Sequence, residues 1–123
     1  MASYETVPTN GFTQTTVQGA LDFVTSTALL RQMATDADVR GRHLLINLRA
    51  ATTTAMSFGD VYRLVGIVGE DPDAFSGRIA LVDTFRESFE KVQFFEASAT
   101  EKGFSVRAFL DEDAAVAWLE RAA

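Results

Sequence analysis

Apolar residues recur along this chain as short runs and as longer stripes with helical spacing. Residues 43–48 (HLLINL) and 79–82 (IALV) form two almost wholly apolar runs, which are typical of strands covered on both faces of a sheet. Residues 104–110 (FSVRAFL) alternate between apolar and other positions, so they predict a further strand. The run at 43–48 is the clearest of the three and predicts the central strand.

A β-hairpin is predicted near the N-terminus. Residues 3–7 and 12–18 are rich in Thr, Val and aromatic side chains, and Pro8, Asn10 and Gly11 lie between them. Proline presets one turn residue and Asn-Gly accepts positive φ, so the two segments are expected to pair as neighbouring strands. Gly19 is expected to end the second strand.

Four further segments have apolar residues at helical spacing, and each begins with a residue suited to the N-cap. They run from Asp22 to about residue 36, from Ser57 to about residue 69, from Thr84 to about residue 102, and onward from Asp111. Ser57, with Asp60 three residues later, approximates a capping box.

This order of elements predicts an α/β fold with a mixed, largely parallel sheet of about five strands and four helices. Strands that alternate with helices are joined by right-handed crossovers and become parallel, whereas the hairpin adds an antiparallel pair. With 123 residues the chain has the length of one domain, so a single domain is expected over residues 1–123.

Composition and charge narrow the class of partner. The chain has no Cys, which excludes disulfides, thiolate metal sites and a Cys nucleophile. Its net charge of −6 disfavours nucleic acid and anionic lipid headgroups as partners. It has no apolar run of membrane-spanning length and begins without the pattern of a signal peptide. We therefore expect a cytoplasmic protein that does not insert into membranes.

Several stretches resemble a STAS-like domain, the fold of anti-sigma-factor antagonists and of sulfate-transporter cytoplasmic domains. They are the strand ending in Gly19, GRHLLINLRA, GRIALV and the ending FSVRAFLDEDAAVAWL. The chain resembles most closely the small stand-alone bacterial proteins of STAS/SEC14-like type. The resemblance covers nearly the whole chain, and it implies one STAS-like domain over residues 1–123.

One position departs from that family. Its signalling members carry Asp-Ser at the start of the helix after the central strand, and the serine is phosphorylated. Here Ala55 and Met56 occupy those places, and Ser57 follows one residue later. The resemblance therefore does not imply a phosphorylation switch, and Ser57 is better explained as a helix N-cap.

The segment from residue 49 to residue 56 is the best candidate for a binding loop. It follows the central strand and precedes a helix N-terminus, where ligands and anions bind in open α/β sheets. Asp83 ends the next strand, where it can orient a ligand or pair with Arg49, although a carboxylate at the surface or beside the helix cap is the favoured interpretation. The alternative is a polar loop whose threonines bond backbone groups. The candidate ligand-binding residues are Arg49, Thr52, Thr53, Thr54, Ser57 and Asp83.

No metal, cofactor or catalytic group is predicted. His43 is the only histidine, and it lies at the start of the central strand, opposite the usual ligand side. The chain has no Gly-x-Ser-x-Gly sequence, and the candidate loop lacks the Gly and Lys of a phosphate-binding loop. Phe94 and Tyr62 lie beside the apolar stripes of their helices, where they are expected to line a pocket, form a dimer contact or widen the core.

Three functions are compatible with these features. The first is a non-enzymatic STAS-like regulatory or interaction module that binds a protein partner or a second copy of itself as a homodimer. The second is a small SEC14-like carrier or sensor of an apolar or anionic ligand. An enzyme ranks last, because the sequence shows no nucleophile with a base and no metal cluster.

Overall fold

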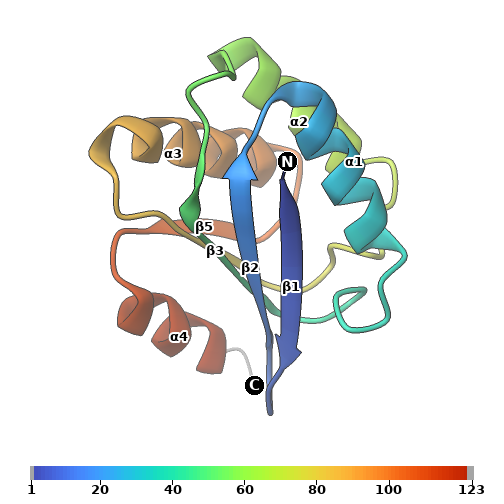
Figure 1. The fold of residues 1–123 in the computed structure, drawn as a ribbon. Coiled ribbons are helices and arrows are strands. Elements are labelled where there is room, and N and C mark those ends of the chain that lie inside the picture. The colour runs from blue at the N-terminus through green and yellow to red at the C-terminus, as the bar shows by residue number, and fades with distance from the viewer. Residues whose placement is uncertain (1, 122–123) are drawn as a thin grey trace.

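The computed structural model describes residues 2–121, apart from the side chain of Glu87, and contains one five-stranded sheet and four helices (Figure 1). The elements, in chain order, are β1 (Ser3–Pro8), β2 (Thr13–Ala20), α1 (Phe23–Ala34), β3 (Leu44–Thr52), α2 (Phe58–Val68), β4 (Ile79–Val82), α3 (Arg86–Glu101), β5 (Val106–Phe109) and α4 (Glu112–Glu120). The predicted order of strands and helices is confirmed.

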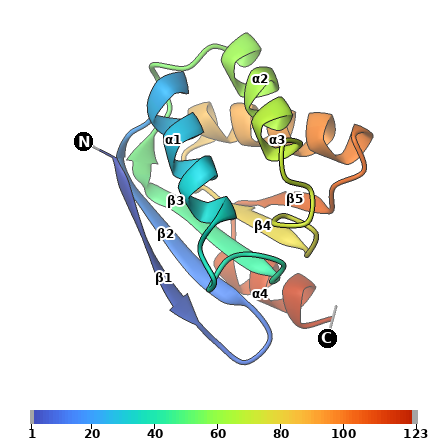
Figure 2. The same cartoon turned by 90° about the vertical axis from the view of Figure 1, so that its right-hand side faces the viewer.

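The sheet is mixed and largely parallel, as predicted. Its strand order is β1-β2-β3-β4-β5, with β1 antiparallel to β2 and every later pair parallel. The strands from β2 onward are added in one direction, so right-handed crossovers bring α1, α2 and α3 to the same face. Helix α4 has no strand after it and covers the opposite face, as Figure 2 shows.

Strand β3 lies at the centre of two cores. Leu44, which is 0% exposed, belongs to the larger core between the sheet and helices α1, α2 and α3. The next residue, Leu45, is 1% exposed and packs in the smaller core under α4. Successive strand residues face opposite sides, so a strand buried on both faces needs apolar residues at every position. This explains the continuous apolar run that predicted the central strand.

Strands β2 and β3 both extend beyond their predicted ends. β3 continues to Thr52 and pairs there with Ala20, although the segment after residue 48 was predicted to be a loop. Gly19, predicted to end β2, instead lies within it at φ 100°. A register shift opposite Val17 places one extra residue in β3, which is the geometry of a β-bulge. Backbone pairing with a neighbouring strand therefore overrides the small, weakly patterned side chains of this segment.

Helix α3 begins later than predicted. Its N-cap is Phe85, which makes no side-chain hydrogen bond, so the prediction of Thr84 as the cap was wrong. Asp83 instead accepts a hydrogen bond from the Phe85 backbone N–H at 3.1 Å. This turn satisfies one of the free N–H groups near the helix start. The residue that stabilises the start of α3 therefore lies one position before the predicted cap.

The capping box at the start of α2 is confirmed. The Ser57 Oγ accepts from the Asp60 N–H at 3.0 Å, and the Asp60 Oδ2 accepts from the Ser57 N–H at 3.1 Å. Replacing Ser57 with alanine is expected to lower the free energy of unfolding by about 1 kcal/mol. Urea denaturation measures this change. Thr54→Ala, at an exposed position three residues earlier, is the control, and an equal loss in both variants would contradict the capping role.

Tyr4 joins β1 to the segment after α1. Its hydroxyl donates to the Asp36 Oδ2 at 2.9 Å. Burial, followed by the hydrogen bond and the negative charge of Asp36, raises the pKa of Tyr4 from 10.0 to about 12. The folded chain therefore holds this proton more tightly than the unfolded chain does, and the contribution to stability is complete below pH 10.

The Tyr4 contact predicts a stability change in alkaline solution. As the pH rises from 10 through about 12, the wild type is expected to lose free energy of unfolding that Tyr4→Phe does not lose. Denaturant unfolding of both proteins across this pH range measures the difference. Parallel pH dependence of the two proteins would contradict the prediction.

Candidate functional site

Arg49 lies on the α4 side of the sheet. Its Nε donates to the Asn47 Oδ1 at 3.1 Å, and its guanidinium forms an ion pair with Glu112 at 3.0 Å. The alternative that Arg49 pairs with Asp83 was therefore wrong. Glu112 lies in the first turn of α4 and occupies the guanidinium that was expected to bind an anion.

The three threonines do not form one cluster. Thr52 is exposed at the end of β3, Thr54 is exposed in the loop that follows, and Thr53 between them is buried. Alternation along an extended chain separates neighbouring side chains in this way. The arrangement of Arg49 and the threonines in one loop was therefore wrong. Ser57 caps α2, and of these residues only Thr53 lines a cavity of the described chain.

Asp83 is the most deeply buried of the candidate residues. It is 1% exposed, and its Oδ1 accepts from the Phe85 N–H. Its Oδ2 is buried and has no hydrogen-bond partner among the residues that the structure describes. Asp83 was expected to be a carboxylate at the surface or beside the helix cap. Its contact with Phe85 agrees with a place beside the cap, and its burial excludes a place at the surface.

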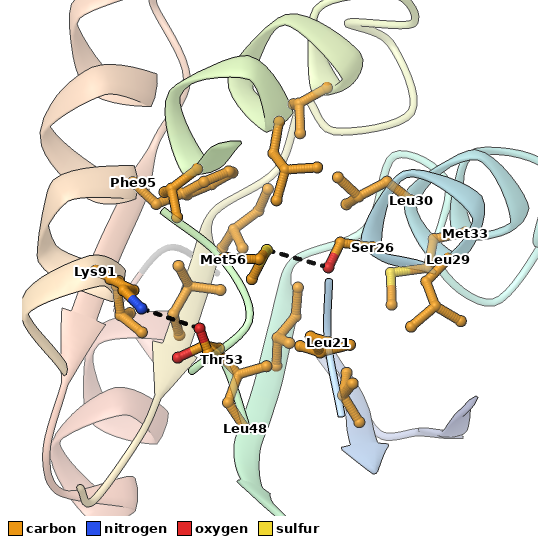
Figure 3. A pocket seen from close by; sticks show the side chains of 18 of the residues that line it. Leu21, Ser26, Leu29, Leu30, Met33, Leu48, Thr53, Met56, Lys91 and Phe95 are labelled. Carbon is orange, nitrogen blue, oxygen red and sulfur yellow. Dashed lines mark hydrogen bonds between the residues drawn. The ribbon is translucent and has the colours of Figure 1, made fainter. Parts of the chain in front are cut away.

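An apolar cavity of about 130 Å³ lies between the sheet and helices α1, α2 and α3. Ser26, Thr53 and Lys91 are the polar residues of its lining, and all the others are apolar. Figure 3 shows Lys91 and Thr53 on one side of the pocket and Leu30 and Met33 on the other. The surface of the cavity is almost wholly apolar even beside these three residues, which suits an uncharged apolar ligand.

Two hydrogen bonds hold the segment between β3 and α2 over this cavity. The Lys91 Nζ donates to the Thr53 carbonyl oxygen at 3.0 Å, and the Ser26 Oγ contacts the Met56 Sδ at 3.6 Å (Figure 3). They join this segment to α3 on one side and to α1 on the other. Met56 is only 6% exposed and lines the cavity.

Lys91 was not identified from the sequence, and Phe94 packs against the larger core, which is one of the three roles expected for it. Phe95 lines the cavity, whereas Phe94 packs edge-to-face on Phe58 with ring centroids 5.4 Å apart. Phe95 belongs to the apolar stripe of α3, and Lys91 lies four residues before it on the same helical face. A lysine on an apolar helical face is the signal that would have identified this residue.

His43 lies just before the start of the central strand β3, at the end opposite Thr52. The His43 Nδ1 accepts from the Arg78 backbone N–H at 2.9 Å, which gives the imidazole a structural role. Among the side chains that the structure describes, no three of His, Asp or Glu are grouped so that they could hold a metal ion. Residues 2–121 include no helix both long and apolar enough to cross a bilayer.

Comparisons with known proteins support the fold. No family model matches the chain, and no curated protein is similar to it in sequence. Among solved structures, the fold is similar to an anti-sigma factor antagonist from Mycobacterium paratuberculosis, with a TM-score of 0.62 and 17% identity. That match covers 98% of this chain and 95% of the other.

A second solved structure gives the same result. It is an uncharacterized protein of the DUF3478 family with a SpoIIAA-like fold from Shewanella loihica PV-4, with a TM-score of 0.59 and 14% identity. The match covers 96% of this chain and 93% of the other. The chain thus has the STAS-like fold that its sequence predicted, and at these identities the likeness shows the fold alone.

Proposed function

We propose that this chain is a non-enzymatic STAS-like module that acts in regulation by binding a small apolar molecule. The observation that carries the proposal is the cavity between the sheet and helices α1, α2 and α3. Its lining belongs largely to the larger core and is apolar apart from Ser26, Thr53 and Lys91. A concave, mostly apolar site with a few polar groups is the usual form of a small-molecule site.

The size of the cavity limits the ligand. Its volume of about 130 Å³ is close to that of an apolar protein cavity of about 150 Å³ that binds benzene. Side chains around an empty cavity lack partner atoms on one side, so a ligand that fills it restores dispersion contacts. We therefore expect an apolar group of roughly six carbon atoms to be buried there.

The position of His43 supports a binding function over catalysis. His43 is the only histidine, and strand β3 separates it from Thr53 by roughly 30 Å at the usual strand rise. A general base must lie within hydrogen-bond reach of the group it activates. His43 therefore cannot serve as a base for Thr53, Ser57 or Asp83.

Binding of 1-hexanol tests the proposal, because this alcohol is uncharged and has an apolar chain of six carbon atoms, which is a suitable size. We expect saturable binding to the wild-type chain in isothermal titration calorimetry. Val92→Phe adds bulk at a position that lines the cavity, and it is expected to weaken binding about tenfold or more. Val24→Phe is the matched control, since Val24 is 75% exposed on α1. This variant is expected to bind 1-hexanol as the wild type does.

Thermal unfolding separates loss of the cavity from loss of the fold. If Val92→Phe folds, it keeps a cooperative unfolding transition. If it does not fold, Leu64→Phe on α2 fills the same cavity and replaces it in the test. Absence of 1-hexanol binding to the wild type would overturn the proposal. Undiminished binding to folded, cavity-filled variants would also overturn it.

A second candidate is an interaction module that binds another protein or a second copy of itself. The Mycobacterium structure is named as an antagonist of an anti-sigma factor, which is itself a protein. On this chain, Phe58 is 45% exposed and Tyr62, one turn later on α2, is 51% exposed. Adjacent exposed aromatic residues are typical of protein contacts.

Sedimentation velocity over a range of concentrations tests self-association. A homodimer formed through α2 is expected to dissociate in Phe58→Asp and to persist in Val7→Asp, a substitution at an exposed valine of β1. A wild-type chain that stays monomeric at all concentrations would exclude the second copy as the partner.

A further inference from the structure

We propose that residues 53–56 form a lid over the apolar cavity, and that a ligand enters when this lid opens and the Met56 side chain turns outward. The inference rests on the proposed function, because it describes entry to the same cavity. It is supported by the place of the segment in the fold, by the few contacts that hold it closed, and by the side chain of Met56.

The segment connects two fixed points. Before it, the Thr52 carbonyl oxygen accepts from the Leu21 N–H at 2.8 Å, which extends the pairing of β2 with β3. After it, the capping box of Ser57 and Asp60 fixes the start of α2. Residues 53–56 lie between these points, outside the helices and strands. The lid can therefore open while the sheet and α2 stay in place.

Few contacts hold the segment closed. Its one internal backbone hydrogen bond runs from the Met56 N–H to the Thr53 carbonyl oxygen at 3.0 Å. Among the described residues, its backbone makes no hydrogen bond to the backbone of another segment. The links to other elements come from side chains, namely the Lys91 Nζ on the Thr53 carbonyl oxygen at 3.0 Å and the Ser26 Oγ on the Met56 Sδ at 3.6 Å. A sulfur atom is a weak acceptor, and segments with so few bonds open locally without unfolding of the whole chain.

The polar residues of the cavity lining all take part in these contacts. Ser26, Thr53 and Lys91 line the cavity, yet its surface is almost wholly apolar. The atoms that form the hydrogen bonds join the segment to α1 on one side and to α3 on the other (Figure 3). The geometry therefore assigns these three residues to holding the lid, and the contact with the ligand to the apolar side chains.

Met56 closes the lid from the inside. It is 6% exposed and lines the cavity, whereas Thr54 and Ala55 just before it are exposed. Methionine has an unbranched side chain with several rotatable bonds, so it adapts to different surroundings. Turning it outward breaks the weak contact with Ser26 and leaves a passage from the solvent to the cavity. An apolar side chain directed inward from an exposed segment is suited to a small lid.

The rate at which 1-hexanol binds tests the lid, because opening precedes entry. Met56→Ala removes the closing side chain and is expected to raise the association rate constant about tenfold. Leu30→Ala is the matched control, since it removes as many side-chain atoms from the lining of the same cavity but lies on helix α1. It is expected to change the association rate constant less than about threefold. NMR line-shape analysis of 1-hexanol titrations into the full chain measures this constant.

Lys91→Met tests the hydrogen bond to the Thr53 carbonyl oxygen. The variant keeps a side chain of similar length and removes the donor, so the association rate constant is expected to rise about threefold or more. Lys102→Met is the matched control, because Lys102 lies exposed at the C-cap of α3 and should leave the constant unchanged. Cooperative thermal unfolding of each variant shows that a changed rate does not come from lost structure.

Amide hydrogen exchange tests the lid without a ligand. The Met56 N–H is expected to exchange about tenfold faster or more than the Ile46 N–H in β3, because opening of the lid leaves the sheet intact. Lys91→Met is expected to increase the ratio of the two exchange rates. Equal exchange rates at the two amides would overturn the lid.

The outcomes distinguish the two proposals. If 1-hexanol does not bind the wild type, the proposed function fails, and the route of entry fails with it. If 1-hexanol binds, the lid alone is overturned by association rate constants of Met56→Ala and Lys91→Met that equal the wild-type value. It is also overturned if Leu30→Ala speeds association as much as Met56→Ala does, since the gain would then come from the size of the cavity.

Discussion

Replacing Leu44 with alanine is expected to lower the free energy of unfolding by about 3–5 kcal/mol. Leu44 is 0% exposed in the central strand, where its backbone pairs with Thr13 of β2 and Ile79 of β4. Strands on both sides and helices above prevent the site from collapsing around the lost methyl groups. Both the transfer free energy and the cavity therefore contribute to the loss. Guanidinium denaturation measures the change.

Leu110→Ala is the matched control for that experiment. Leu110 follows the last strand and is 49% exposed, so the same substitution there is expected to change stability by about 0.5 kcal/mol or less. Similar losses at both positions would contradict the assignment of Leu44 to the core. A change in the denaturant dependence of Leu44→Ala would indicate altered compactness of one state, and the comparison would then use thermal unfolding.

Gly77→Ala is expected to lower the free energy of unfolding by about 2–3 kcal/mol for a steric reason. A Cβ added at Gly77 would lie 2.5 Å from the Arg42 carbonyl oxygen and 2.9 Å from the His43 nitrogen. Both atoms belong to the backbone that leads into β3, so they cannot move as the end of a flexible side chain can. The substitution must displace the chain where β3 and β4 begin side by side.

Gly66→Ala is expected to stabilise the chain, in contrast to Gly77→Ala. Gly66 lies inside α2, and an added Cβ would have nothing within 4 Å. Alanine there is expected to raise the free energy of unfolding by about 0.5–1 kcal/mol, because glycine loses more backbone entropy in a helix. Thermal unfolding of the two variants measures the expected loss of stability in Gly77→Ala and the expected gain in Gly66→Ala. A stabilised Gly77→Ala chain would contradict the close approach of the backbone at that glycine.

Local patterns predicted the elements of the fold well. The hairpin follows from its turn residues, and the start of α2 follows from Ser57 and Asp60, whose hydrogen bonds form within four residues. The central strand follows from its continuous apolar run, because burial on both faces requires that composition. Each of these features depends on neighbours along the chain, so the sequence contains the information directly.

Element boundaries were predicted less well. β3 continues past residue 48 because β2 supplies backbone partners as far as Ala20, and these partners come from a distant part of the chain. At the start of α3, the side chain of Asp83 replaced the expected cap at Thr84. In both cases a local preference was weak, and a hydrogen bond of the folded chain decided the outcome.

The candidate site shows the same division. Sequence alone determined the STAS-like α/β order of elements and the central strand. Only the tertiary structure decided that Arg49 faces α4, that Thr53 lines the cavity and that Lys91 lies beside Thr53. The direction of a side chain near a bulge depends on strand register, and a cavity depends on how three helices pack together. Neither property is contained in any short stretch of sequence.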